Sequence, residues 1–156
     1  DTLKGGRIKR IERYVEGDTF LLTYGDGVAD VDIDKLIEFH HSHGKIATIT
    51  GVDPVARFGE LGLDGNVVTS FREKPEASKS GGLINGGFFV LNRKIFDYLS
   101  EDEDCDFEFG ALEELAQSGE LMVYNHKGHW SCMDTLRDMT YLNKIWDEGQ
   151  APWKIW

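Results

Sequence analysis

Hydrophobic and polar residues alternate along the chain in a way that predicts strands and helices in turn. Phe20–Tyr24 is a short apolar run that stops at Gly25-Asp26-Gly27, which is typical of a strand buried on both faces. Apolar residues at helical spacing follow over Ile33–His43, and Gly44 is a stop signal. The β-branched run Ile46–Val52 predicts the next strand.

The remainder of the chain continues this alternation. An Asp-Gly turn within Leu61–Phe71 predicts a hairpin, and Ile84–Leu91 predicts a long strand that two glycines interrupt. The other expected elements are three helices and a strand, at Ile8–Val15 (helix), Phe107–Ser118 (helical in its second half), Leu121–Asn125 (strand) and Asp134–Trp146 (helix). Such alternation predicts an α/β fold with a mainly parallel sheet, and the 156 residues predict a single domain over 1–156.

Charge and composition narrow the classes of partner. The chain has 17 basic and 28 acidic residues, a net charge of −11, so we expect neither a nucleic acid polymer nor a membrane as partner. Its two cysteines, Cys105 and Cys132, lie in no metal-ligand spacing, which indicates a reducing, cytoplasmic setting. A single disulfide between them stays open at this point. A small phosphorylated ligand is compatible with the charge where a few cations or a metal lie locally.

Two aspartates stand at positions where α/β proteins bind ligands, just beyond a strand. Asp26 lies between two glycines, which allow a sharp turn and a close ligand approach, so it either holds a divalent metal or bonds its own backbone in the turn. Asp134 precedes the last predicted helix, so it either joins Asp26 at a metal or caps that helix.

Two further motifs also lie at strand ends. Lys74 closes a strand before Pro75, and it is either a phosphate clamp, with Glu73 beside it for sugar hydroxyls, or half of a solvated charge pair. Asn85-Gly86-Gly87 marks either close approach of a ligand or a β-bulge. The histidines of His40–His43 fall at a helix end, where His40 is expected in the core rather than at a metal.

These motifs together resemble those of the sugar-1-phosphate nucleotidyltransferases, and three of them resemble the glucose-1-phosphate cytidylyltransferase branch. The resemblance extends over nearly the whole chain. The motifs that point to this branch are Tyr24-Gly25-Asp26-Gly27-Val28, Ile84-Asn85-Gly86-Gly87-Phe88-Phe89-Val90 and Met133-Asp134-Thr135-Leu136-Arg137-Asp138. Arg57-Phe58-Gly59 and Phe71-Arg72-Glu73-Lys74-Pro75 match the wider family.

The resemblance implies a three-layer α/β/α nucleotide-diphospho-sugar transferase fold, Rossmann-like, and a reaction. A cytidylyl group passes from CTP to α-D-glucose 1-phosphate, giving CDP-glucose and pyrophosphate for bacterial surface polysaccharides. By the match, Asp26 and Asp134 would hold Mg²⁺ and Lys74 would bind the sugar phosphate. The remaining substrate-binding residues implied by the match are Glu73, Asn85, Gly86, Arg57, Gly59 and Thr135. Homo-oligomers are common in such proteins.

One departure from the family pattern concerns the triphosphate. The family's glycine-rich loop, of the form Gly-Gly-x-Gly-Thr-Arg, has no counterpart, so the chain matches the C-terminal portion of a family member and the fold is expected to be incomplete at its N-terminal side. Three hypotheses follow: an enzyme, a sugar-phosphate-binding module without chemistry, and a non-catalytic assembly fragment. Use of another nucleoside triphosphate or sugar phosphate also stays open.

Overall fold

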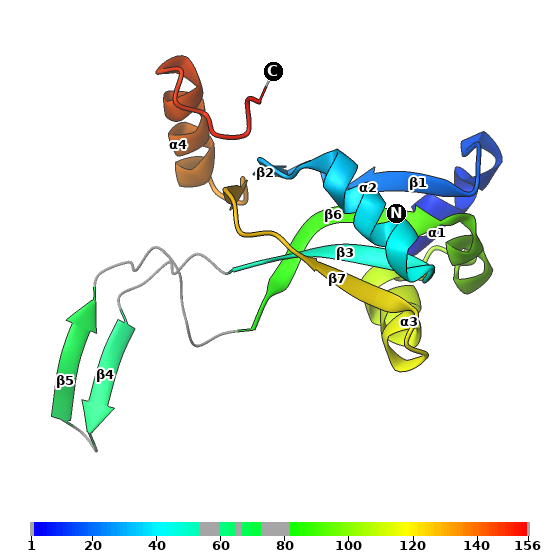
Figure 1. Cartoon of the computed structure of the whole chain (residues 1–156), viewed down its shortest axis with the longest axis horizontal. Coiled ribbons are helices and arrows are strands. Elements are labelled where there is room, and N and C mark those ends of the chain that lie inside the picture. The colour runs from blue at the N-terminus through cyan, green and yellow to red at the C-terminus, as the bar shows by residue number, and fades with distance from the viewer. Residues whose placement is uncertain (1, 54–59, 65–66, 73–81, 156) are drawn as a thin grey trace.

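The computed structural model describes residues 2–53, 60–64, 67–72 and 82–155, and within them a four-stranded sheet forms the centre of the fold (Figure 1). Its order is β1 (Thr19–Thr23), β6 (Ile84–Asn92), β3 (Ala47–Val52) and β7 (Leu121–Asn125). β3 and β7 pair in parallel, whereas β6 is antiparallel to both β1 and β3. The predicted α/β class is confirmed, and the sheet is mixed because β6 alone runs against the other three strands.

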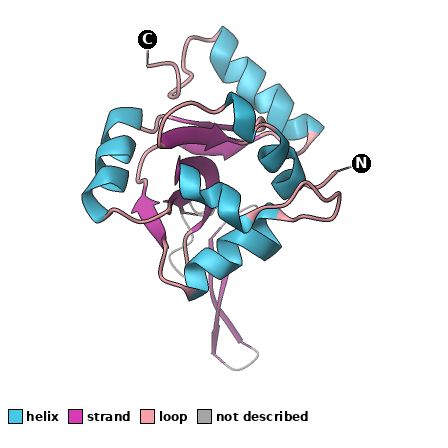
Figure 2. Cartoon of the chain, turned by 90° about the vertical axis from the view of Figure 1, so that its right-hand side faces the viewer, coloured by secondary structure: helices cyan, strands magenta, loops and turns pink. Residues whose placement is uncertain are grey.

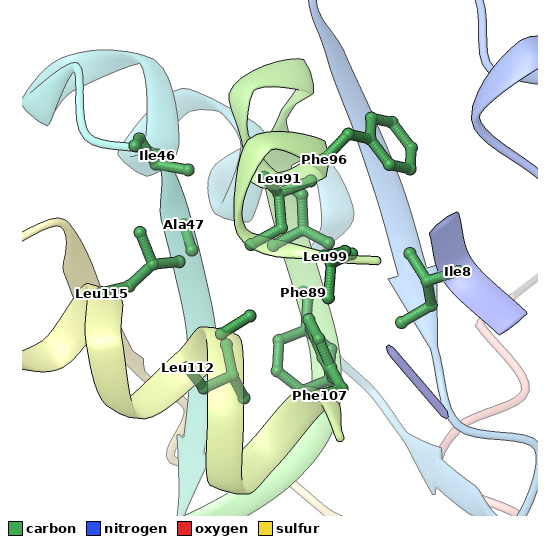
Figure 3. Close-up of a cluster of buried hydrophobic side chains, with 12 residues drawn as sticks. Ile8, Ile46, Ala47, Phe89, Leu91, Phe96, Leu99, Phe107, Leu112 and Leu115 are labelled. Atoms are coloured by element: carbon green, nitrogen blue, oxygen red, sulfur yellow. The ribbon is translucent and has the colours of Figure 1, made fainter. Parts of the chain in front are cut away.

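Helices cover both faces of this sheet, and the alternation of residues along β6 explains why (Figure 2). Val90 points to one face and packs with Leu36 of α2 (Ile33–His43). Phe89 and Leu91 point to the other face, into the larger core cluster of Figure 3. That cluster is completed by α1 (Lys4–Arg10), η2 (Arg93–Tyr98), η3 (Phe107–Leu112) and α3 (Glu113–Gln117). The arrangement therefore has three layers, as the resemblance implies.

The first helix begins earlier than the sequence pattern predicts. α1 starts at Lys4, before Ile8, and a short 3₁₀ turn, η1 (Glu12–Tyr14), follows it. Gly5 is buried in α1, and a Cβ at this position would lie only 2.7 Å from the carbonyl oxygen of Cys105. Close packing thus favours glycine in a helix despite its low helix propensity.

Smaller elements complete the described chain. β2 (Gly27–Ala29) and β8 (Trp130–Cys132) form an antiparallel ribbon, and α4 (Leu136–Asp147) follows β8. β4 (Glu60–Asp64) pairs with β5 (Val67–Arg72), which confirms the predicted hairpin. Cys105 and Cys132 are not joined by a disulfide. Every helix in the described ranges is too short or too polar to cross a bilayer.

Candidate functional site

The β2–β8 ribbon brings the two predicted metal ligands to one place. Gly27 pairs with Cys132, so Asp26 and Met133 are the next residues at the same end of the ribbon. The backbone N–H of Met133 donates to the carbonyl of Asp26 over 2.8 Å. Asp26 and Asp134, more than one hundred residues apart in the chain, therefore lie at one end of the ribbon, and both are exposed.

The structure decides which residue caps α4. Thr135 is the N-cap: its hydroxyl accepts from the backbone N–H of Asp138 at 3.2 Å, and the Asp138 carboxylate accepts from the N–H of Thr135 at 3.0 Å. One interpretation of the sequence placed Asp134 at the N-cap of α4. Thr135 lies there instead, and that interpretation is therefore wrong. The Asp134 carboxylate instead accepts from the Cys132 thiol at 3.2 Å.

The donor set at this end of the ribbon fits magnesium. Mg²⁺ prefers oxygen ligands, and it is usually held by one or two carboxylates together with substrate phosphates. Asp26 and Asp134 supply two carboxylates on exposed positions. Among the described residues there is no cluster of three or more potential metal ligands, so phosphate or water oxygens would have to complete the coordination.

Asn85-Gly86-Gly87 forms a bulge in β6. Ile49 pairs with Phe89, but Gly51, two residues later, pairs with Asn85, so β6 contains two extra residues at this point. Gly87 has a φ of 77°, in the left-handed region that glycine adopts without strain. The bulge interpretation is thus confirmed, and bulges commonly lie next to active sites, where they redirect a side chain.

Gly86 itself is required by packing. A Cβ there would lie 2.9 Å from Val52 Cγ1 and 3.0 Å from the carbonyl oxygen of Thr50, both on β3. The close approach that the glycine permits is therefore an approach to a neighbouring strand.

Backbone and indole contacts join this bulge to the rest of the site. The indole N–H of Trp130 donates to the carbonyl of Gly86 over 2.8 Å. The N–H of Tyr24 donates to the carbonyl of Gly87 over 2.9 Å. Three segments, after β1, at the start of β6 and along β8, are thereby held together.

Neither Tyr24, which begins one of the family motifs, nor Glu108 was predicted as a site residue, yet Tyr24 lies beside Asn85 and Glu108 lies beside Tyr24. The Tyr24 hydroxyl donates to the Glu108 carboxylate, and Asn85 Nδ2 lies 3.4 Å from the Tyr24 oxygen. Burial, followed by the bond to Glu108, raises the pKa of Tyr24 above its ordinary value, so the hydroxyl stays protonated at neutral pH. Trp130 was missed in the same way; its position four residues before Asp134 was the available signal.

The structure therefore brings together Asp26, Asn85, Gly86, Asp134 and Thr135. Four other predicted site residues, Arg57, Gly59, Glu73 and Lys74, lie outside the described residues.

Comparison with known proteins gives close relatives over almost the full chain. It is 51% identical over 156 residues to a glucose-1-phosphate cytidylyltransferase of Salmonella typhi, covering 99% of this chain and 60% of the relative. It is 46% identical to a probable glucose-1-phosphate cytidylyltransferase of Bacillus subtilis, covering 100% of this chain and 60% of the relative. The chain thus spans about three fifths of the length of these curated relatives.

Two solved structures share the fold of this chain. HddC from Yersinia pseudotuberculosis superposes with a TM-score of 0.62 at 25% identity, over 94% of this chain and 64% of that one. A presumed glucose-1-phosphate thymidylyltransferase from Bacillus anthracis, in complex with sucrose, gives a TM-score of 0.67 at 18% identity, over 92% and 61%. The family model described as nucleotidyl transferase matches residues 7–147. The chain therefore belongs to the nucleotidyl transferase family.

Proposed function

We propose that this chain forms the sugar-phosphate and metal side of a glucose-1-phosphate cytidylyltransferase. In that reaction a phosphate oxygen of α-D-glucose 1-phosphate attacks the α-phosphorus of CTP. The bond from that phosphorus to the β-phosphate oxygen breaks, and pyrophosphate leaves with the electron pair. The proposal is supported by 51% identity to a relative with this name and by the shared position of Asp26 and Asp134 at one end of the β2–β8 ribbon.

The single observation that carries the proposal is this pairing of two carboxylates beside the Asn85-Gly86 bulge. Two like charges held at one end of a ribbon favour a bound cation. Bound Mg²⁺ would neutralise phosphate charge there, and such transfers depend mainly on alignment and charge neutralisation.

The other assignments belong to the same proposal. Lys74 would contact the sugar phosphate, Glu73 and Asn85 would bind glucose hydroxyls, and Gly86 with Arg57 and Gly59 would line the pocket. The choice of CTP rests on the named relatives. The proposal includes a cytoplasmic location, a role in surface polysaccharide synthesis and assembly into homo-oligomers, which the family resemblance implies.

Calorimetric titration of the chain with glucose 1-phosphate, with and without Mg²⁺, tests the proposal. We expect binding in the millimolar range or tighter that Mg²⁺ strengthens, and we expect Asp26→Asn and Asp134→Asn to lose the magnesium effect. Asp147→Asn, at the far end of α4, is the control and should behave as the wild type. No heat at millimolar glucose 1-phosphate would contradict the proposal.

Pyrophosphate release from CTP, glucose 1-phosphate and Mg²⁺, with other nucleotides as controls, then separates the hypotheses. CTP-selective release identifies the chain as catalytic by itself. Binding without release favours a sugar-phosphate-binding unit that needs further residues for the triphosphate.

A further inference from the structure

A chain of polar contacts runs from helices α1 and η3 to the exposed side chain of Asn85. Lys4 of α1 forms an ion pair with Glu108 of η3, and its ammonium lies 4.7 Å from the centre of the Tyr24 ring. The Tyr24 hydroxyl bonds to the same Glu108 oxygen, and Asn85 Nδ2 lies 3.4 Å from that hydroxyl. Three other parts of the sequence are therefore linked in series to the Asn85 amide.

The direction of each hydrogen bond in this chain is determined by donor and acceptor chemistry. A carboxylate only accepts, so Glu108 must receive the hydroxyl proton of Tyr24. The Tyr24 oxygen is then left with acceptor capacity alone, and the group of Asn85 that faces it must be the NH₂.

A second, independent contact assigns the same orientation. The backbone N–H of Gly87 donates to Asn85 Oδ1 over 2.8 Å. A flipped amide would place its NH₂ against this N–H and lose the bond. Gly87 is itself held in the bulge, where its carbonyl accepts from the N–H of Tyr24 at 2.9 Å.

Burial differs along the chain of contacts in a way that suits ligand recognition. Tyr24 is half-buried and its ring packs against Phe89, with centroids 5.5 Å apart. Asn85, by contrast, is exposed. Its carbonyl oxygen accepts from the Gly87 N–H and one amide proton is bonded to Tyr24, so the second amide proton is the donor that these contacts leave for a ligand.

We propose that Tyr24 and Glu108 are positioning residues that hold the Asn85 amide as a hydrogen-bond donor toward a hydroxyl oxygen of the sugar phosphate. The inference rests on the proposed function for the identity of the ligand. It adds that the Asn85 amide donates to the oxygen of a sugar hydroxyl. It also adds that Tyr24 and Glu108, which do not contact the ligand, fix the orientation of this amide.

The test uses the 156-residue chain, labelled with ¹⁵N, and follows the side-chain amide of Asn85 by NMR. In the wild type we expect the amide proton that is bonded to Tyr24 to be shifted from the position of an unbonded amide, and we expect glucose 1-phosphate to move mainly the other amide proton. Tyr24→Phe keeps the ring but removes the hydroxyl. It should return the shifted proton toward the position of an unbonded amide and weaken glucose 1-phosphate binding about fivefold, the loss of one ordinary hydrogen bond.

Matched variants distinguish positioning from general destabilisation. Glu108→Ala should behave like Tyr24→Phe, whereas Glu108→Gln retains an acceptor for the hydroxyl and should stay within about twofold of the wild type. Tyr14→Phe, on an exposed tyrosine, is the control and should change neither the amide nor the affinity.

The outcomes separate the two proposals. Normal amide signals and affinity in Tyr24→Phe and Glu108→Ala would overturn the positioning role, although the sugar phosphate still binds. If Tyr24→Phe moves the amide proton but the wild-type signals do not respond to glucose 1-phosphate, the proposed function is contradicted while the fixed orientation of the amide is still supported.

Discussion

The indole N–H of Trp130 donates to the backbone carbonyl of Gly86 across 2.8 Å, and this bond links β8 to the bulge at the start of β6. It connects the strand that leads to Asp134 with the residue beside Asn85. The Trp130 side chain therefore joins the segment before Asp134 to the segment that carries Asn85.

Trp130→Phe should destabilise the chain by about 1–2 kcal/mol, because the Gly86 carbonyl loses its donor and the phenyl ring is smaller than the indole. Urea unfolding measures this change in the free energy of unfolding. Trp146→Phe, at an indole that is 43% exposed, is the control and should cost less than about 0.5 kcal/mol. Equal losses in the two variants would show that the indole bond does not stabilise the bulge.

Gly86→Ala should cost about 1–3 kcal/mol, because the new methyl group would press against Val52 and the Thr50 carbonyl on β3. Gly25→Ala is the matched control, since nothing lies within 4 Å of a Cβ at that position. Thermal unfolding of both variants compares them directly, and a Gly86→Ala chain as stable as Gly25→Ala would refute the packing argument.

Thr135→Ala should destabilise α4 by about 1 kcal/mol, because the variant lacks the hydroxyl that accepts from the Asp138 N–H. Thr135→Ser keeps this acceptor and should stay close to the wild type. Circular dichroism during urea unfolding follows the helix. If alanine and serine had the same effect, the cap would contribute nothing measurable.

Two histidines share the hydroxyl of Thr48 at the end of α2. The backbone N–H of Lys45 donates to His43 Nδ1 at 3.0 Å, so neutral His43 carries its proton on Nε2 and donates to Thr48 Oγ1 at 2.8 Å. The Thr48 hydroxyl then donates to His40 Nδ1, 2.9 Å away. This order of protons requires both rings to be neutral.

Acid should therefore destabilise the fold through His40. Burial, with the nearby His43 and His41, lowers the pKa of His40 to about 4, and burial lowers the pKa of His43 as well. An unfolded histidine titrates near pH 6.5, so the unfolded chain binds more protons below that pH. The contribution to stability is full above about pH 6.5 and is lost as the pH falls toward 4.

Urea unfolding between about pH 7 and pH 4 checks this sign. The free energy of unfolding should fall as the pH is lowered in the wild type and in the control His41→Gln, at an exposed ring. His40→Gln should flatten the slope. If His40→Gln left the slope unchanged, the acid sensitivity would come from other groups, such as the Glu120 carboxylate that pairs with Lys45.

The sequence by itself predicted most elements and several positions of the site. Periodic side chains predicted α2 with the observed limits, Ile33–His43, and β7 with the observed limits, Leu121–Asn125. Such patterns can be read from the sequence because burial of one helix face leaves a helical period, and a buried strand leaves a short apolar run. The family motifs, which are also local, identified Asp26, Asn85 and Asp134 as candidates.

Only the tertiary structure decided how those local pieces meet. The three-residue strands β2 and β8 carry too little pattern to predict, yet their register places Asp26 beside the segment that leads to Asp134. The Tyr24 hydroxyl beside the Asn85 amide bonds to Glu108 of η3, which also pairs with Lys4 of α1, so these contacts join distant parts of the chain. Pairing register and long-range polar contacts depend on the whole packed chain, so no short stretch of residues contains them.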